Sequence, residues 1–211
     1  MAIVIDDESY FTLKGDEVRG NDRVWTRDIT TCPPEVRFKQ KAKFSKKLLV
    51  HCAISPKGVS KISFVEGGYA VNAQRYIQML RQAVVPFICA NHSNGRYWFW
   101  MDLASAHFAN ATLDFLRQER IRFVPKDANP PSVASLRPVE DFWAALKKAV
   151  YDGGWEATSF PALKRRIKQK ARQLTAPAND PPPFQYNQRT LADLRLRWIL
   201  VCPPLGFDLP P

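Results

Sequence analysis

The chain has few cysteines and histidines, and neither type forms a recognisable ligand pattern. Four cysteines are spread over 211 residues without a Cys-x-x-Cys pair, and the three histidines show no metal-ligand spacing. This distribution argues against a zinc site and a disulfide framework, and it predicts reduced thiols in an intracellular compartment. The sequence also has no recognisable signal peptide and no apolar run of membrane-spanning length, so no membrane partner is expected.

Acidic residues are also scarce relative to basic ones. The chain has 31 lysines and arginines against 20 aspartates and glutamates, which gives a net charge of +11 and a pI near 9.7. Such an excess predicts a polyanionic partner, with nucleic acid favoured and a membrane surface as the competitor. A length of 211 residues with 45% hydrophobic side chains is enough for one domain with a sizeable core.

The hydrophobic pattern predicts an α/β domain with a mixed sheet. Apolar runs indicate strands at 2–6, 48–54, 59–65, 97–101 and 121–124, and helical spacing indicates helices at 73–85, 108–116, 139–150 and 163–174. A three-stranded antiparallel start followed by βαβ crossovers fits an RNase H-like fold. We therefore expect about five strands with helices on both faces of the sheet.

The composition changes near residue 176. Eight of the 17 prolines lie in 177–211, where one helix is possible on the spacing of Leu191, Leu194, Trp198 and Val201. We therefore predict a folded domain over 1–175 and a proline-rich, loosely attached C-terminal tail over 176–211.

Three acidic residues occupy positions where side chains could converge. Asp7 and Asp102 each follow a predicted strand, and Glu140 lies in the first turn of a predicted helix, just after Pro138. Ligands collect beyond the carboxyl ends of strands in such sheets. Neighbouring carboxylates repel one another unless a cation lies between them, and carboxylate oxygens suit Mg²⁺ or Mn²⁺. The alternative is that both aspartates are ordinary strand-ending loop residues.

Three segments resemble the catalytic blocks of the Tc/mariner superfamily of DDE transposases. Residues 5–11 (IDDESYF) resemble the first block, residues 100–107 (WMDLASAH) the second, and residues 137–147 (RPVEDFWAALK) the third. Because 37 residues separate Asp102 from Glu140, the chain is similar to a longer-spaced branch of the superfamily. The resemblance runs from residue 2 to about residue 174.

The resemblance implies a catalytic domain in which Asp7, Asp102 and Glu140 bind two Mg²⁺ or Mn²⁺ ions. The implied reaction is cleavage of DNA at transposon ends and transfer of the 3′-hydroxyl into target DNA, in the nucleus. DNA would then be the main partner, and a homodimer is a further possibility.

Other residues are expected to contact DNA or a second copy. His107, five residues after Asp102, would contact phosphate or support a metal ligand, or else be a surface residue at a helix start. Trp25 lies where the family has a clamp loop that packs on the partner subunit, or is a plain loop aromatic. The predicted DNA-contacting cations, which could equally form solvated faces, are Lys39, Lys41, Lys43, Lys164, Arg165 and Lys168.

The chain also departs from the family pattern. Full proteins of the family begin with paired helix-turn-helix modules, which residues 1–211 do not include, and Leu103 replaces the more usual Asn. We therefore expect a catalytic domain apart from its main sequence reader. An inactive or domesticated DNA-binding or dimerisation module remains the alternative. A cellular RNase H-like nuclease is less favoured because the third block points elsewhere.

Overall fold

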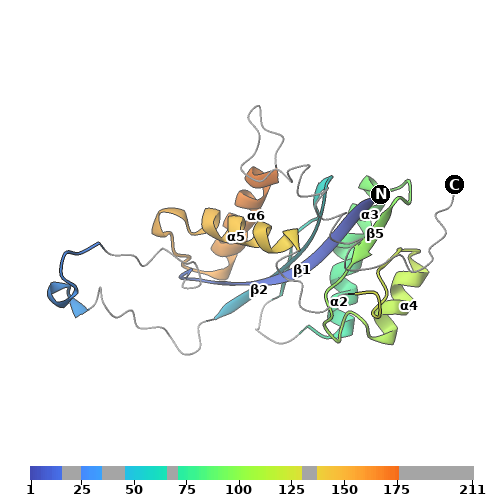
Figure 1. The fold of residues 1–211 in the computed structure, drawn as a ribbon, viewed down its shortest axis with the longest axis horizontal. Helices are drawn as coiled ribbons and strands as arrows, with labels where there is room; N and C mark the ends of the chain where they lie inside the picture. Colours follow the sequence, from blue (N-terminus) through green and yellow to red (C-terminus); the bar gives the residue numbers. More distant parts are fainter. Residues whose placement is uncertain (16–24, 35–45, 66–70, 130–136, 176–211) are drawn as a thin grey trace.

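The computed structural model describes residues 1–15, 25–34, 46–65, 71–129 and 137–175. Its centre is a five-stranded mixed sheet built around the long strand β1 (Ala2–Thr12) (Figure 1). Strand β2 (Lys47–Ser55) runs antiparallel along one side of β1, and β5 (Tyr97–Trp100) runs parallel along the other. The mixed sheet predicted from the order of elements is therefore present.

Strand β1 is longer than the predicted strand over 2–6. Its pairing with β2 continues to the Thr12–Lys47 pair, whereas its pairing with β5 stops at the Ile5–Trp100 pair. The expectation that Asp7 ends its strand is therefore wrong. The chain stays extended because Phe11, further along, is buried in the core and anchors the strand beyond the acidic residues.

The predicted hairpin after β1 is confirmed, although its returning strand is broken. Strands β3 (Gly58–Val59) and β4 (Ser63–Val65) both pair with β2. Between them, the Ser60 amide donates to the carbonyl of Ala53 at 2.7 Å, and the Ser60 hydroxyl accepts from the Ala53 amide at 2.9 Å. A side chain thus replaces one backbone acceptor where the ladder is interrupted.

Helices cover both faces of the sheet, and each layer has its own core. On one face lie α5 (Pro138–Val150) and α6 (Phe160–Thr175), packed with Ile5 and Phe11 of β1. On the other lie α2, α3 and α4. Their bounds are Ala73–Met79 for α2, Val85–Asn91 for α3 and Asn110–Gln118 for α4.

Helix α2 leads without a break into α3, so the predicted helix over 73–85 extends further than expected. Asn72 caps its start, as predicted, by accepting from the Arg75 amide at 2.9 Å. A π-helical turn, η2 (Leu80–Val84), joins α2 to α3 immediately before Pro86. Because proline lacks an amide proton and crowds the preceding turn, the wider π turn lets the helix pass it.

The predicted strand over 121–124 is reduced to a single parallel bridge between Phe123 and Phe99. Phe99 donates to the Arg122 carbonyl at 2.8 Å and accepts from the Val124 amide at 2.9 Å. Pro125 follows at once and cannot donate to a ladder, so the pairing ends there. Among the helices of the described residues, none is both long and apolar enough to cross a membrane.

Two short helical turns complete the described elements, η1 (Ile29–Thr31) and η4 (Asp152–Gly154). The segment around η1 lies well apart from the sheet and its helices (Figure 1). Within it, Trp25 is 95% exposed and Ile29 is 65% exposed. The basic residues Lys39, Lys41 and Lys43 and the proposed tail over 176–211 lie outside the described residues.

Candidate metal site

The candidate site forms where β1 and β5 stop pairing. The last parallel pair joins Ile5 to Trp100, and two residues further on along each chain stand Asp7 and Asp102. Because the two strands run in the same direction, this register brings the two acids side by side at the carboxyl end of β5. The geometry predicted for these two aspartates is therefore present, although Asp7 lies within its strand rather than at its end.

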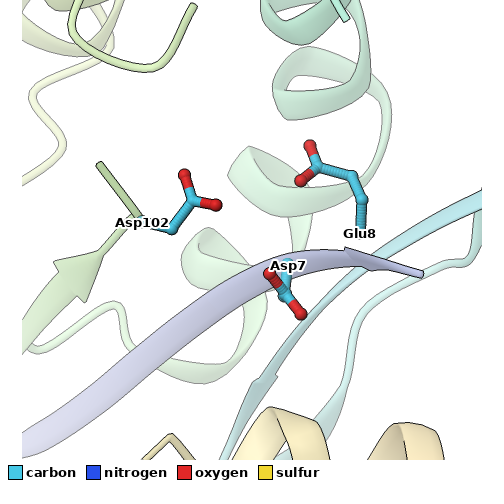
Figure 2. A group of neighbouring side chains, drawn as sticks. All are labelled: Asp7, Glu8 and Asp102. Carbon is cyan, nitrogen blue, oxygen red and sulfur yellow. The ribbon is translucent and has the colours of Figure 1, made fainter. Parts of the chain in front are cut away.

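Glu8 joins them to make a group of three carboxylates. One oxygen from each of Asp7, Glu8 and Asp102 lies within 4.8 Å of the others. Figure 2 shows the three side chains around β1, with the carboxylates of Glu8 and Asp102 pointing toward each other. Three acids this close repel one another in the absence of a cation.

Asp7 faces helix α5, and its polar partners are Trp143 of that helix and Arg137, the residue just before it. The indole Nε1–H of Trp143 donates to its Oδ2 at 3.0 Å, and Nη1 of Arg137 lies 3.8 Å from its Oδ1. Burial and, to a smaller extent, the charges of Glu140 and Glu8 raise the pKa of Asp7 to about 7, against the lowering effect of Arg137. Near neutral pH this carboxyl is therefore poised between its protonated and charged forms.

Asp102 is held by the loop that follows β5. Its Oδ1 accepts from the Ala104 amide at 2.9 Å and lies 2.5 Å from Nδ1 of His107. Burial acts to raise the pKa of Asp102, but His107, the Ala104 amide and the charge of Arg137 together lower the pKa below its usual value. Both contacts are made to Oδ1, so Oδ2 is the oxygen that is left to face a cation.

His107 lies between two of the acids and is buried. Its Nε2 lies 3.4 Å from Oε1 of Glu8, and its side chain is 1% exposed. Burial acts to lower the pKa of His107, but Asp102 and Glu8 together raise it to about 10. His107 is thus a charged partner of the acidic group and does not lie at the surface of a helix start.

Asp6 points to the opposite face of β1 from Asp7. It is fully buried, and its Oδ2 accepts from the Tyr76 hydroxyl at 2.5 Å and lies 3.2 Å from Nε2 of His51. The Asp6 carbonyl also accepts from Nη2 of Arg137 at 2.6 Å. Of the two neighbouring aspartates, therefore, Asp7 joins the acidic group and Asp6 is bonded within the core.

Glu140 lies in the first turn of α5 and is exposed. It is close enough for its charge to raise the pKa of Asp7, but it is not one of the three acids whose oxygens meet. Its assignment as the third metal ligand stays a prediction.

The predicted DNA-contacting cations of the described residues lie on α6. Nζ of Lys164 and Nζ of Lys168 lie 5.8 Å and 5.4 Å from the centre of the Phe64 ring, and Arg165 is exposed. Helix α6 therefore presents basic side chains, two of which lie over the ring of Phe64 in β4. Its role in binding DNA stays a prediction.

The donor set fits a hard divalent cation. The three acids supply only oxygen, which Mg²⁺ and Mn²⁺ prefer over sulfur or imidazole-rich sites. An ion would relieve the mutual repulsion of these carboxylates and favour the charged form of Asp7. Asp7 and Asp102 would hold it, with Glu8 within reach.

Sequence reasoning missed Glu8, Trp143 and Arg137 as parts of the site. Strand alternation places Glu8 on the opposite side of β1 from Asp7, so nothing in the spacing joins the two. Trp143 carried a usable signal, because a buried indole N–H needs an acceptor. Arg137 carried one as well, since a cation just before an acidic helix start is available to pair with strand carboxylates.

Comparisons with known proteins identify the fold. No family model matches the chain. The Tc3 transposase of Caenorhabditis elegans is 25% identical over 165 residues, which are 78% of this chain and 47% of that protein. A pre-cleavage Mos1 transpososome matches with a TM-score of 0.70 and 19% identity, over 99% of this chain and 57% of that one. The Mos1 catalytic domain solved with raltegravir and Mn matches with a TM-score of 0.61 and 19% identity, over 99% of this chain and 84% of that one.

These matches confirm the RNase H-like fold predicted from the order of strands and helices. The chain spans about half the length of Tc3 transposase and of the Mos1 chain in the transpososome. In sequence the chain is similar to Tc3 transposase, and in fold it is similar to the Mos1 structures.

Proposed function

We propose that the chain is the catalytic part of a DNA transposase, which cleaves DNA at transposon ends and joins the freed 3′-hydroxyl to target DNA. The observation that carries the proposal is the meeting of the Asp7 and Asp102 carboxylates beside the last parallel pair of β1 and β5. The resemblance to Tc3 transposase supports the same reaction class. Such an activity on chromosomal DNA would take place in the nucleus.

Asp7, Asp102 and Glu140 are the residues we assign to binding Mg²⁺ or Mn²⁺, with two ions per site. Bound ions of this kind activate the attacking oxygen and stabilise charge on the departing 3′ oxygen. The presence of Mn or Mg in the solved Mos1 catalytic domains supports the choice of cation. The exposed position of Glu140 on the first turn of α5, within electrostatic reach of Asp7, supports its inclusion.

Several residues of the chain would prepare the site for this reaction. Trp143 and Arg137 hold the carboxylate of Asp7 from the side of α5, and His107 holds Asp102 and Glu8 from the opposite side. Fixing both acids in advance lowers the cost of assembling the site around the ions and the DNA.

Two surfaces would bring partners to the site. The basic side chains of α6 (Lys164, Arg165 and Lys168) would follow a DNA backbone, and the lysines at 39, 41 and 43 would add to them. The exposed Trp25, on a segment that lies apart from the sheet, would pack against a second copy of the chain.

A nicking assay on supercoiled plasmid DNA with Mn²⁺ tests the proposal. We expect the wild-type chain to nick, and Asp102→Asn and Glu140→Gln to reduce the rate by at least about 100-fold. Asp141→Asn is the matched control, because Asp141 is the next exposed acid in the same helical turn. We expect it to leave the rate unchanged. Equal nicking by wild type and both site variants would contradict the enzymatic assignment and favour a non-catalytic DNA-binding or dimerisation module.

A further inference from the structure

Tyr76 connects the buried aspartate of β1 to the acidic group. Its side chain is fully buried, and its hydroxyl donates to Oδ2 of Asp6 at 2.5 Å. Nε2 of His51 reaches the same oxygen at 3.2 Å. Because a buried carboxylate costs several kcal/mol unless it is hydrogen-bonded, these two contacts fix Asp6 and the Tyr76 hydroxyl relative to β1.

The ring of Tyr76 stacks on His107. The two ring centres are 3.9 Å apart and the planes differ by 26°. Stacking fixes the plane of the imidazole, and the same imidazole places Nδ1 at 2.5 Å from Asp102 and Nε2 at 3.4 Å from Glu8. A continuous line of contacts therefore runs from Asp6 through Tyr76 and His107 to two acids of the candidate site.

We propose that Tyr76 is a positioning residue of the metal site, acting through His107. Its hydroxyl fixes the ring against Asp6, and its ring face sets the orientation of His107. His107 in turn holds Oδ1 of Asp102, so that Oδ2 faces the ion. This inference rests on the proposed metal site, and it assigns a role to a helix residue that touches neither the ion nor the DNA.

The competing explanation is that Tyr76 only fills the core beneath α2. Both explanations predict a loss of stability when the side chain is shortened, so stability alone does not separate them. They differ on metal affinity in the folded protein. A pure packing role leaves Mn²⁺ binding intact, whereas a positioning role weakens it, since residues that orient metal ligands typically contribute about 10- to 100-fold in affinity.

The test measures the affinity of the full 211-residue chain for Mn²⁺. Electron paramagnetic resonance detects the bound ion, at a temperature below the unfolding temperature of each variant. We expect Tyr76→Leu to weaken Mn²⁺ binding about tenfold and Tyr76→Phe, which keeps the stacking ring, to stay within about threefold of wild type. The matched control is Tyr151→Phe. Tyr151 is another buried tyrosine, and its hydroxyl donates to the Thr12 carbonyl of the same strand at 2.5 Å. Its loss should leave Mn²⁺ affinity unchanged.

A second variant tests the line of contacts from its other end. His107→Gln removes the stacked ring and should also weaken Mn²⁺ binding about tenfold. His92→Gln is its control, since His92 is equally buried but contacts Ser55. In the metal-free protein, the ring-nitrogen NMR signals of His107 should move in Tyr76→Leu and stay in place in Tyr151→Phe.

The outcomes separate this inference from the proposed function. If Tyr76→Leu binds Mn²⁺ as tightly as wild type does, the role of Tyr76 is overturned and the metal site stands. If the leucine variant does not fold, equal Mn²⁺ affinity in His107→Gln leads to the same conclusion. A wild-type chain that binds no Mn²⁺ would overturn the metal site itself, together with this inference.

Discussion

Asp6 and Asp7 are neighbours in β1, yet their surroundings differ in kind. Asp6 is fully buried with the Tyr76 hydroxyl and His51 as partners, and its face of the sheet is covered by α2 and α4. Asp7 faces α5, where it contacts Trp143 and Arg137, and its carboxylate also lies close to those of Glu8 and Asp102. One step along the strand thus separates a carboxylate bonded within the core from one available to a cation.

The largest effect on stability is expected for Asp6. Asp6→Ala removes the carboxylate oxygen that accepts from the Tyr76 hydroxyl and lies beside Nε2 of His51, so both buried groups lose this partner. We expect a loss of roughly 2–3 kcal/mol in the free energy of unfolding, measured by urea denaturation at pH 7. A loss no larger than that of an exposed control such as Asp141→Asn would mean that the buried bonds of Asp6 contribute little.

Asp7→Asn should change stability in the opposite direction. In the folded protein burial raises the pKa of Asp7 to about 7, from 3.8 in an unfolded chain. The contribution of Asp7 to the free energy of unfolding is therefore most favourable below pH 3.8, and it is lost as the pH rises from 3.8 through 7. Without metal, we expect Asp7→Asn to raise the unfolding free energy by about 1–2 kcal/mol at pH 8.

The pH dependence provides the control for that prediction. The gain from Asp7→Asn should shrink as the pH is lowered from 8 toward 4, where the folded wild type carries a neutral carboxyl at this position. Thermal unfolding of both proteins across this range measures it. A gain that stays constant with pH would show that the pKa of Asp7 is not raised.

Trp143→Phe tests the partner that α5 supplies to Asp7. The substitution keeps an aromatic ring but removes the N–H that donates to Asp7 at 3.0 Å. We expect a loss of about 1–2 kcal/mol at pH 8, where the carboxylate is charged, and a smaller loss at pH 5. In a double-mutant cycle of Trp143→Phe with Asp7→Asn, the two changes in unfolding free energy should be non-additive. Simple additivity would contradict the contact.

The smallest effect on stability is expected on the outer face of α6. Arg165→Ala removes an exposed cation and should alter the unfolding free energy by less than about 0.5 kcal/mol. If α6 follows a DNA backbone, the same change should reduce the slope of log affinity against log salt by about 1. A salt slope equal to that of wild type would remove Arg165 from the DNA-contacting surface.

The sequence predicted the sheet, its layers and the proximity of Asp7 to Asp102 because these follow from strand order and direction. It did not predict that β1 runs on to Thr12, since the acids at 6–8 interrupt the apolar run that marks a strand. The passage of α2 into α3 across Pro86 was missed because it depends on a π turn, which has no simple sequence pattern.

The supporting residues of the site were harder to predict than the acids. Tyr76 fits an apolar helical stripe, and only the fold shows that its hydroxyl reaches Asp6 and its ring stacks on His107. Glu8 joins the acidic group because β5 no longer pairs with β1 beyond Ile5, an event that depends on the lengths of two separate strands. Contacts between distant segments of this kind have no local signal.

Anomalous diffraction from crystals grown with Mn²⁺ tests the central assignment most directly. We predict a manganese peak within about 2.5 Å of carboxylate oxygens from both Asp7 and Asp102. The same map would show whether Glu140 turns inward as a further ligand or Glu8 takes that place. Well-ordered crystals with no peak between Asp7 and Asp102 would contradict the account.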